Sequence, residues 1–341
     1  MVKGSFRNWK YFFILVPSML VIAGNLLGGI YTLSNFIFTF VILGFAEILL
    51  PEDRSNDDIA DDKLPEILLF LCVIAQIISI SSLAYGITEG SITGFWIIAA
   101  SLSTGTSSGT MAIVVAHELI HRKEKLWNLA GRLLLFSVFN PYFYVHHLRV
   151  HHKYVGTSAD PVTARYGETY YKYVVRSIAS QIGQAFQMEQ QRCIKKGQSA
   201  FGLQNYMVIC SIGYVLVLIF SAYFLGIPAA AALLSQAVIA NLLLEYTNYI
   251  EHYGLSRTDT ERVNETHSWQ SDKLVSRFFL IDLSRHADHH YHASKSFHKL
   301  LSHPQSPVLP GGYASLFLPV LIPPLWFRLV NGRIPVKEQL I

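Results

Sequence analysis

The sequence predicts an all-α integral membrane protein, with about six transmembrane helices and a polar cap that carries clustered histidines. Of its 341 residues, 51% are hydrophobic and 15% are charged, whereas soluble domains carry about 25% charged residues. Six apolar stretches also have the length of about twenty residues that crosses a bilayer core. They lie near 10–31, 34–50, 65–86, 93–116, 205–225 and 229–248. Because spans and cap form one unit in such bundles, we expect a single domain over residues 1–341.

Two further apolar segments do not fit a full crossing. The stretch 127–145 is interrupted by Arg132 and by Asn140-Pro141, which favours a helix at the membrane interface. Residues 313–330 are broken by three prolines, so a buried or interfacial segment is expected there.

The distribution of basic residues predicts the orientation. With the N-terminus inside, the outer loops near 31–36, 86–92 and 225–228 contain none of the 27 Lys and Arg residues, as the positive-inside rule requires. The remaining segments, 51–64, 117–204 and 249–341, then face the cytoplasm and hold all 14 histidines. Within them, the acidic stretch 51–63 is expected to be a solvated connector.

Charge and cysteine content exclude two other classes of protein. The net charge is only +4, and the basic residues do not form the patch that nucleic-acid binding requires. The three cysteines, Cys72, Cys193 and Cys210, are far apart and form no CxxC pair. Neither a disulfide scaffold nor a cysteine-bound electron carrier is therefore expected.

Nine histidines in four segments have the spacing of metal ligands. In AHELIHR two histidines lie four residues apart, which places them on one face of a helix. YVHHLRVHHKY repeats that spacing and adds a neighbour, SRHADHHYH contains spacings of three and four, and TNYIEHYGL contains one histidine. The candidates are His117 and His121; His147, His151 and His152; His252; and His286, His289 and His290.

Nine imidazoles exceed the coordination number of one metal ion but suit two ions that keep positions open for oxygen. Imidazole nitrogen suits iron, copper, nickel and zinc alike, so the ligand type leaves the metal open. His146 and His292 adjoin the clusters and are left outside the set. The other three histidines lack such spacing and are expected to be hydrogen-bonding or surface residues.

HELIH is also an HExxH sequence, the signature of zinc proteases, in which Glu118 would act as the general base. Such a protease needs only one further ligand. The other two clusters and His252 would then have no purpose, so this remains a minor alternative.

Four motifs, HELIHR, HHLRVHHKYVGTSADP, NYIEHYGL and LSRHADHH, resemble in order and spacing the signatures of the membrane-bound non-haem di-iron alkane hydroxylases. This family lies within the membrane fatty acid desaturase and hydroxylase superfamily. The likeness extends through GETYYKYVVRSI, HSWQSDKLVS and LPGGYASLFLPVLIPPLWFR, and it covers most of the chain. It implies that the same nine histidines bind two iron ions, with His147 rather than His146 as a ligand.

The resemblance also implies an activity, its partners and a location. The enzyme would hydroxylate the terminal methyl group of medium- to long-chain alkanes to primary alcohols. It would use O2 and electrons from rubredoxin, which receives them from a rubredoxin reductase. The enzyme would lie in the bacterial cytoplasmic membrane, with the N-terminus and the histidine clusters on the cytoplasmic side. Related di-iron hydroxylases or desaturases that act on methylarenes or acyl chains are the alternative.

Several neighbouring residues are candidates for supporting roles. Glu118, Glu251 and Asp288 each adjoin a proposed ligand and are nominated as hydrogen-bond partners of ligand histidines; ordinary salt bridges are the alternative. Four phenylalanines of the second span are candidates for setting how deep a substrate reaches, with plain packing as the alternative. They are Phe36, Phe38, Phe40 and Phe45.

Basic residues near the clusters are candidates for steering an acidic rubredoxin. Attraction to anionic lipid headgroups explains them equally well. These residues are Arg122, Lys123, Lys125 and Lys153.

Overall fold

A computed structural model describes residues 5–56 and 63–335 of the chain. Within these ranges every regular element is a helix, and the only β pairings are two isolated bridges. Six helical segments are long and apolar enough to cross a membrane, which confirms the six predicted spans. They are Asn8–Leu27, Gly29–Leu49, Leu64–Thr88, Phe95–Ile120, Tyr206–Leu225 and Ile227–His252.

Several spans are built from consecutive helical elements. The first comprises η1 (Ser5–Leu15) and α1 (Val16–Leu27), and the second comprises η2 (Gly29–Leu33), α2 (Ser34–Ile37), η3 (Phe38–Ile42) and α3 (Leu43–Leu49). The third is α4 (Leu64–Thr88), and the fourth comprises α5 (Phe95–Ser107), η4 (Ser108–Ala112) and α6 (Ile113–Ile120). The last two are α11 (Tyr206–Leu225) and α12 (Ile227–His252).

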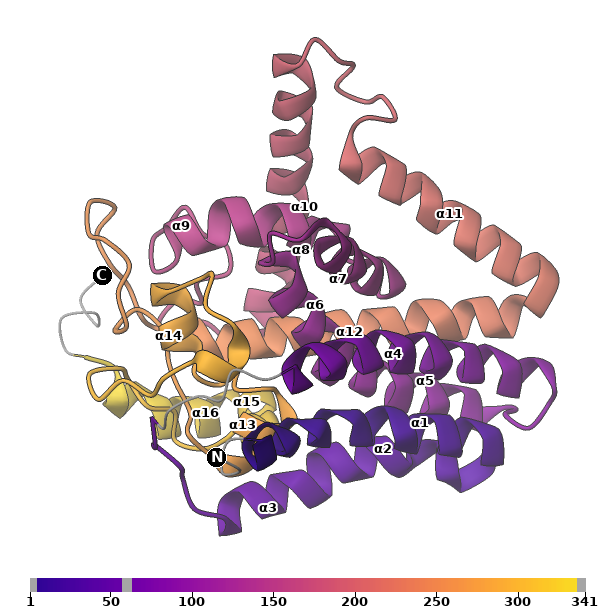
Figure 1. The fold of residues 1–341 in the computed structure, drawn as a ribbon, viewed down its shortest axis with the longest axis horizontal. Coiled ribbons are helices and arrows are strands. Elements are labelled where there is room, and N and C mark those ends of the chain that lie inside the picture. The colour runs from indigo at the N-terminus through magenta and orange to yellow at the C-terminus, as the bar shows by residue number, and fades with distance from the viewer. Residues whose placement is uncertain (1–4, 57–62, 336–341) are drawn as a thin grey trace.

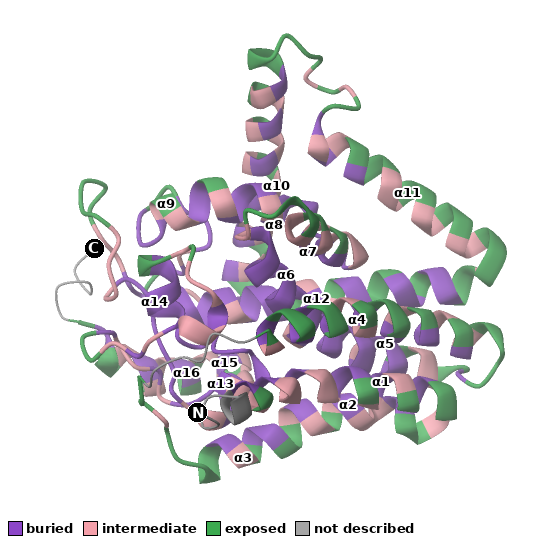
Figure 2. Ribbon diagram, in the orientation of Figure 1, coloured by how far each residue is buried: buried purple, intermediate pink, exposed green. Residues whose placement is uncertain are grey.

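The fourth span and α12 form the centre of the bundle, whereas α11 stands apart from it (Figures 1 and 2). Of the most apolar window in each span, 78% of the residues are buried in the fourth span but only 6% in α11. Glycines allow the central pair to approach closely. A Cβ atom on Gly105 would lie 2.6 Å from the Cβ of Ile239 in α12, so only glycine fits this crossing.

Short helices and the long α10 form the cap at the end of the bundle where α6 and α12 finish (Figure 1). The first group is α7 (Lys125–Ser137), α8 (Pro141–His146), η5 (His147–His151), α9 (His152–Tyr154) and α10 (Tyr170–Lys195). The second is α13 (Leu274–Phe279), α14 (His286–Tyr291), η6 (Phe297–Lys299), α15 (Phe317–Leu321), α16 (Pro323–Val330) and η7 (Asn331–Arg333). Since α7 ends before Asn140 and α15 ends before Pro323, neither of the two doubtful apolar segments forms a crossing, as predicted.

Part of the acidic connector belongs to the cap, which corrects the prediction that 51–63 is solvated. The buried guanidinium of Arg277 binds the Asp53 carboxylate, and the amide of Asn56 donates to the carbonyl of Ser302 at 2.8 Å. Sequence composition could not reveal these partners, because they lie more than 200 positions away. Residues 57–62 of the predicted connector lie outside the described residues.

Three elements among the described residues are π-helices: η3, η4 and η5. π-Helical turns are rare and frequently occur at functional sites. Each of the three contributes residues to the metal centre or to the cavity beside it, as described below.

Candidate metal centre

The structure brings all nine predicted ligand histidines together in two groups. In each group the candidate ligand atoms lie within 4.8 Å of one another. The five-histidine site consists of His117, His121, His147, His152 and His289, and the four-histidine site consists of His151, His252, His286 and His290. The other five histidines belong to neither group; His146, for example, contacts Gln184.

The ends of the two central spans supply one member of each site. The fourth span continues to Ile120 and α12 continues to His252, each four residues beyond its predicted end. His117 and His252 therefore lie in the last turn of membrane-spanning helices instead of following them. Their positions depend on the tight packing of the two spans.

The spacing predicted that histidines of one sequence cluster would share a metal site, but each site combines histidines from different clusters. His147 and His151 were expected to share a helix face, but His147 joins His152 in the five-histidine site and His151 belongs to the other site. The cause is the π-helix η5, whose i to i+5 bonding brings residues five positions apart together. The last cluster is divided as well, because His286 and His290 share a site and His289 turns to the other.

Distances within each group match those between neighbouring ligands of one metal ion. The Nε2 atoms of His147 and His152 lie 2.9 Å apart, and those of His286 and His290 also lie 2.9 Å apart. Two ligands at right angles with metal–nitrogen bonds of about 2.1 Å would be about 3 Å apart. In addition, the buried Nε2 atoms of His117 and His252 have no hydrogen-bond partner. The donor set therefore fits two metal ions.

Burial keeps the histidines in the form that binds metal. Burial, with a smaller electrostatic effect of the neighbouring His151, lowers the pKa of His121 to about 4. Burial and the neighbouring imidazoles also hold the pKa values of other members well below the usual range; these members are His147, His152, His286, His289 and His290. Neutral imidazoles keep a lone pair free for coordination at neutral pH.

Asp160 orients a ligand histidine, a role that our sequence analysis missed. Its Oδ2 atom lies 2.9 Å from Nδ1 of His151. Burial alone would raise the pKa of Asp160, but the adjacent His151 lowers this pKa to about 2, so the carboxyl is ionised. Carboxylates of this kind fix the tautomer and orientation of metal-bound histidines. The signal for this role in the sequence is the GTSADP segment of the second motif, which contains Asp160.

Two of the three nominated carboxylates have other partners. Glu118 accepts hydrogen bonds from Arg122, at 2.7 and 3.0 Å, and from the backbone N–H of Phe297. Because these contacts occupy both carboxylate oxygens, the geometry also counts against the protease alternative. Asp288 instead contacts His292, Lys295 and His303, which are outside both sites. The nominations of Glu118 and Asp288 as partners of ligand histidines are therefore wrong.

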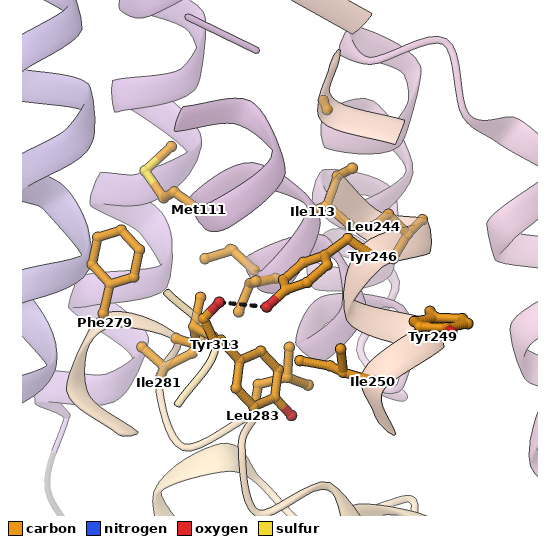
Figure 3. Packing of buried hydrophobic residues seen from close by; sticks show 14 of the residues in the cluster. Met111, Ile113, Leu244, Tyr246, Tyr249, Ile250, Phe279, Ile281, Leu283 and Tyr313 are labelled. Carbon is orange, nitrogen blue, oxygen red and sulfur yellow. Dashed lines mark hydrogen bonds between the residues drawn. The ribbon is translucent and has the colours of Figure 1, made fainter. Parts of the chain in front are cut away.

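Glu251 is the nominated carboxylate that does contact a ligand histidine. Its Oε2 atom lies 3.2 Å from Nε2 of His286, on the side that faces the metal position. Its Oε1 atom accepts a 2.7 Å hydrogen bond from the hydroxyl of Tyr313. Tyr313 is held in turn by Tyr246, whose hydroxyl donates to the Tyr313 carbonyl at 2.6 Å (Figure 3).

A narrow, largely apolar cavity leads to the five- and four-histidine sites. Its outer part has a volume of about 40 Å³ and its inner part about 20 Å³. Both parts are lined by Gly109, Val114 and Thr247, so they adjoin. The outer part is also lined by Phe40, Leu243, Tyr246, Phe279 and Leu280, and the inner part by His117, Phe143, His147, Leu244, Glu251 and His286.

Only one of the four predicted phenylalanines lines this cavity. Phe40 does so, and Phe36 packs on it with ring centres 5.1 Å apart. Phe38 instead packs against Phe13, and Phe45 is 65% exposed on the outer surface of the bundle. The prediction is wrong for Phe38 and Phe45, because helix phase determines which side chains point inward and the π-helix η3 changes that phase.

The basic residues nominated for docking differ in their availability. Lys123, Lys125 and Lys153 are exposed, whereas Arg122 forms the ion pair with Glu118 and is only partly accessible. Arg122 is therefore better described as the counterion of a buried carboxylate.

Comparisons with known proteins agree with this geometry. A family model described as fatty acid desaturase matches residues 93–304, which contain all nine histidines. The chain is 33% identical to alkane 1-monooxygenase 1 of Pseudomonas aeruginosa over 89% of this chain and 83% of that protein. It is 32% identical to an alkane 1-monooxygenase of Pseudomonas putida over 94% of this chain and 84% of that protein.

A relative whose name indicates another substrate is more distant. The xylene/toluene monooxygenase hydroxylase component XylM of Pseudomonas putida is 27% identical over 94% of this chain and 87% of that protein. The higher identities belong to the alkane enzymes. The chain therefore belongs to the fatty acid desaturase family and, within it, to the membrane-bound alkane 1-monooxygenases.

Proposed function

We propose that this chain hydroxylates the terminal methyl group of medium- to long-chain linear alkanes to primary alcohols, with O2 as the oxidant. The observation that carries this proposal is the narrow, largely apolar cavity, whose inner part is lined by His117, His147 and His286. A linear hydrocarbon has no polar group for recognition, so shape and apolar contact must position it. Because the free space is small, entry of a chain requires movement of side chains such as Phe40 and Leu243.

The nine histidines would hold two iron ions, one in the five-histidine site and one in the four-histidine site. When bound, such an iron pair supplies the oxygen-activating chemistry. The protein supplies position and a dry environment. Asp160 orients His151, and Tyr313 holds the Glu251 carboxylate beside His286. The apolar side chains of the lining, such as Val114, Phe143 and Leu244, limit the access of water to the reacting methyl group.

Electrons would come from a rubredoxin, which receives them from a rubredoxin reductase. The absence of Lys and Arg from the predicted outer loops supports a cytoplasmic cap in the bacterial inner membrane. A soluble donor would then reach the metal centre from the cap side. We further infer that residues 1–341 act as one oxygenase domain, because both central spans and the cap contribute to the same sites.

A second candidate is hydroxylation of a methylarene, which the likeness to XylM favours. Desaturation or hydroxylation of an acyl chain is a further alternative within the family.

The test is to express the chain with a rubredoxin and its reductase and to supply linear alkanes, xylenes and fatty acyl lipids together. Primary alcohols formed from the alkanes are the expected products. Benzylic alcohols alone would favour the second candidate, and unsaturated lipid alone would overturn the proposal. Cells that express the His286→Ala variant serve as the background control.

A further inference from the structure

A polar stripe runs along the membrane-spanning helix α12 toward the metal centre. Asn241, Glu245, Asn248 and His252 are spaced by four, three and four residues, so they share one helix face. Glu245 and Asn248 are both buried. Ionisable residues inside a span are costly and usually mark function, including proton transfer.

Glu245 is incompletely satisfied by its surroundings. One carboxyl oxygen accepts a 2.8 Å hydrogen bond from the amide of Gln181, which also donates to Ser177 at 2.9 Å. The other oxygen is buried without a hydrogen-bond partner. Among the described residues, no Lys, Arg or His forms an ion pair with it. The titratable groups that face it are Tyr142 of α8 and Tyr170 and Tyr173 of α10.

The inner end of this network opens on the metal centre. Asn248 lies one turn from Glu245 and lines the inner cavity together with His117 and His286. Its amide nitrogen is also buried without a partner. The unsatisfied amide of Asn248 therefore lies between the Glu245 carboxyl and the space where the substrate methyl group would react.

The other end of the network is the buried side chain of Tyr173, which lies toward the cap. This side chain faces Glu245, and its hydroxyl donates to the carbonyl of Val162 at 3.0 Å. Val162 lies between Asp160 and Thr163, which line a hollow of about 750 Å³ in the cap. Exposed residues such as Arg165 and Asp259 form part of this hollow, which we call the cap hollow.

We propose that Glu245 relays protons from the cap hollow, by way of Tyr173, to the inner cavity during turnover. This inference rests on the proposed function. Each hydroxylation consumes one O2, two electrons from the protein donor and two protons; one oxygen atom enters the C–H bond and the other leaves as water. For each proton, the Glu245 carboxyl releases one on the Asn248 side and regains one from the Tyr173 hydroxyl. Water from the cap hollow then returns a proton to Tyr173, so the states of both groups are restored.

If the role of Glu245 were purely structural, its hydrogen bond with Gln181 would serve only to hold α10 against α12. Glu245→Gln preserves the side-chain shape and still accepts a hydrogen bond from Gln181, but it cannot carry a proton. Gln181→Met is the matched control, because it removes the hydrogen bond between Gln181 and Glu245 and leaves the carboxyl group in place. Both variants are assayed in the full chain with a linear alkane, the donor and the reductase.

If Glu245 relays protons, Glu245→Gln lowers kcat by about 10²-fold, the low end of what a positioned proton donor contributes. KM for the alkane and the iron content stay unchanged, and the solvent deuterium isotope effect on kcat increases. Glu245→Asp, which keeps a carboxyl group, recovers part of the loss. Gln181→Met has the kcat and the isotope effect of the wild type.

A Glu245→Gln variant with wild-type turnover and isotope effect overturns the proposal. If that variant loses iron, the Tyr173→Phe variant is tested in its place. The relay predicts a larger solvent isotope effect on its turnover, measured with rates normalised to iron content, and a wild-type isotope effect excludes the relay. Failure of the proposed function gives a different result, because the wild-type chain itself would form no alcohol from alkanes. The relay is then tested with the substrate of the mixture that the wild type does oxidise.

Discussion

The two metal positions are built from the same residue type but differ in their surroundings. In the five-histidine site, His121 and His152 are only partly buried, whereas all four members of the other site are buried. The four-histidine site has the oriented ligand His151, held by Asp160, and it has Glu251 beside His286. The first site thus has more ligands, and the second has more support from neighbouring carboxylates.

This difference indicates that the two sites tolerate change differently. A site with five nitrogens keeps four after the loss of one ligand, whereas a site with four keeps only three. Conversely, changes of a neighbouring carboxylate should affect the four-histidine site alone.

The largest effect is expected from removal of single ligands. His290→Ala leaves three histidines at its site, so we expect the iron content to fall from about two to about one per chain and hydroxylation to be lost. His121→Ala leaves four, so its site should keep the metal with lower affinity. Iron analysis of the purified proteins measures both, with His292→Ala, outside both sites, as the control. Equal iron loss in the two variants would contradict the contrast.

Loss of the carboxylate that orients His151 should have a smaller effect. Asp160→Asn removes the charge that fixes the tautomer of His151, and we expect iron affinity at the four-histidine site to fall by about 10- to 100-fold. Competition with a chelator measures this affinity. Asp288→Asn is the control, because the two histidines that Asp288 contacts, His292 and His303, lie outside both sites. An effect of the same size from Asp288→Asn would show that the site does not depend on Asp160 in particular.

Substrate selectivity should respond to the cavity lining without any change in the metals. Phe40→Ala lengthens the cavity, so we expect longer alkanes to gain by about tenfold in relative kcat/KM for each added methylene that the new space accommodates. Phe45→Ala is the matched control on the same span, because Phe45 points away from the cavity. Product profiles from an alkane mixture provide the measurement. Identical profiles for the two variants would show that Phe40 does not limit chain length.

The smallest effect on the centre is expected from Arg122. Arg122→Met leaves the buried Glu118 without its cation, and we expect about 1–3 kcal/mol of stability to be lost. Iron content and turnover should remain unchanged, and thermal denaturation measures the stability loss. Unchanged stability together with weaker saturation by the electron donor would instead support a docking role for Arg122.

The membrane architecture was predictable because its signals are local. A span requires about twenty apolar residues in a row, and all six were recognised with boundary shifts of a few residues. The break before Pro323 and the short α7 were also expected from proline and polar residues. The nine histidines were recognised because helical spacing and the four motifs both point to them.

The arrangement of the site depends on tertiary structure, which spacing does not contain. The division between His147 and His151 follows from the π-helix η5, and no residue pattern signalled that local change of helix. The contact of Asp160 with His151 bridges nine positions across a turn, whereas adjacency drew attention to Glu118 and Asp288. Likewise, helix phase decided between Phe40 and Phe45, and both are equally apolar in sequence.

The central claim is that nine histidines hold two iron ions in unequal sites. Mössbauer spectroscopy of the full chain, purified in detergent with ⁵⁷Fe and combined with metal analysis, tests it most directly. We predict two irons per chain and two signals of equal area with different parameters, of which Asp160→Asn changes only one. A single iron per chain, zinc in place of iron, or two signals that Asp160→Asn changes equally would contradict the claim.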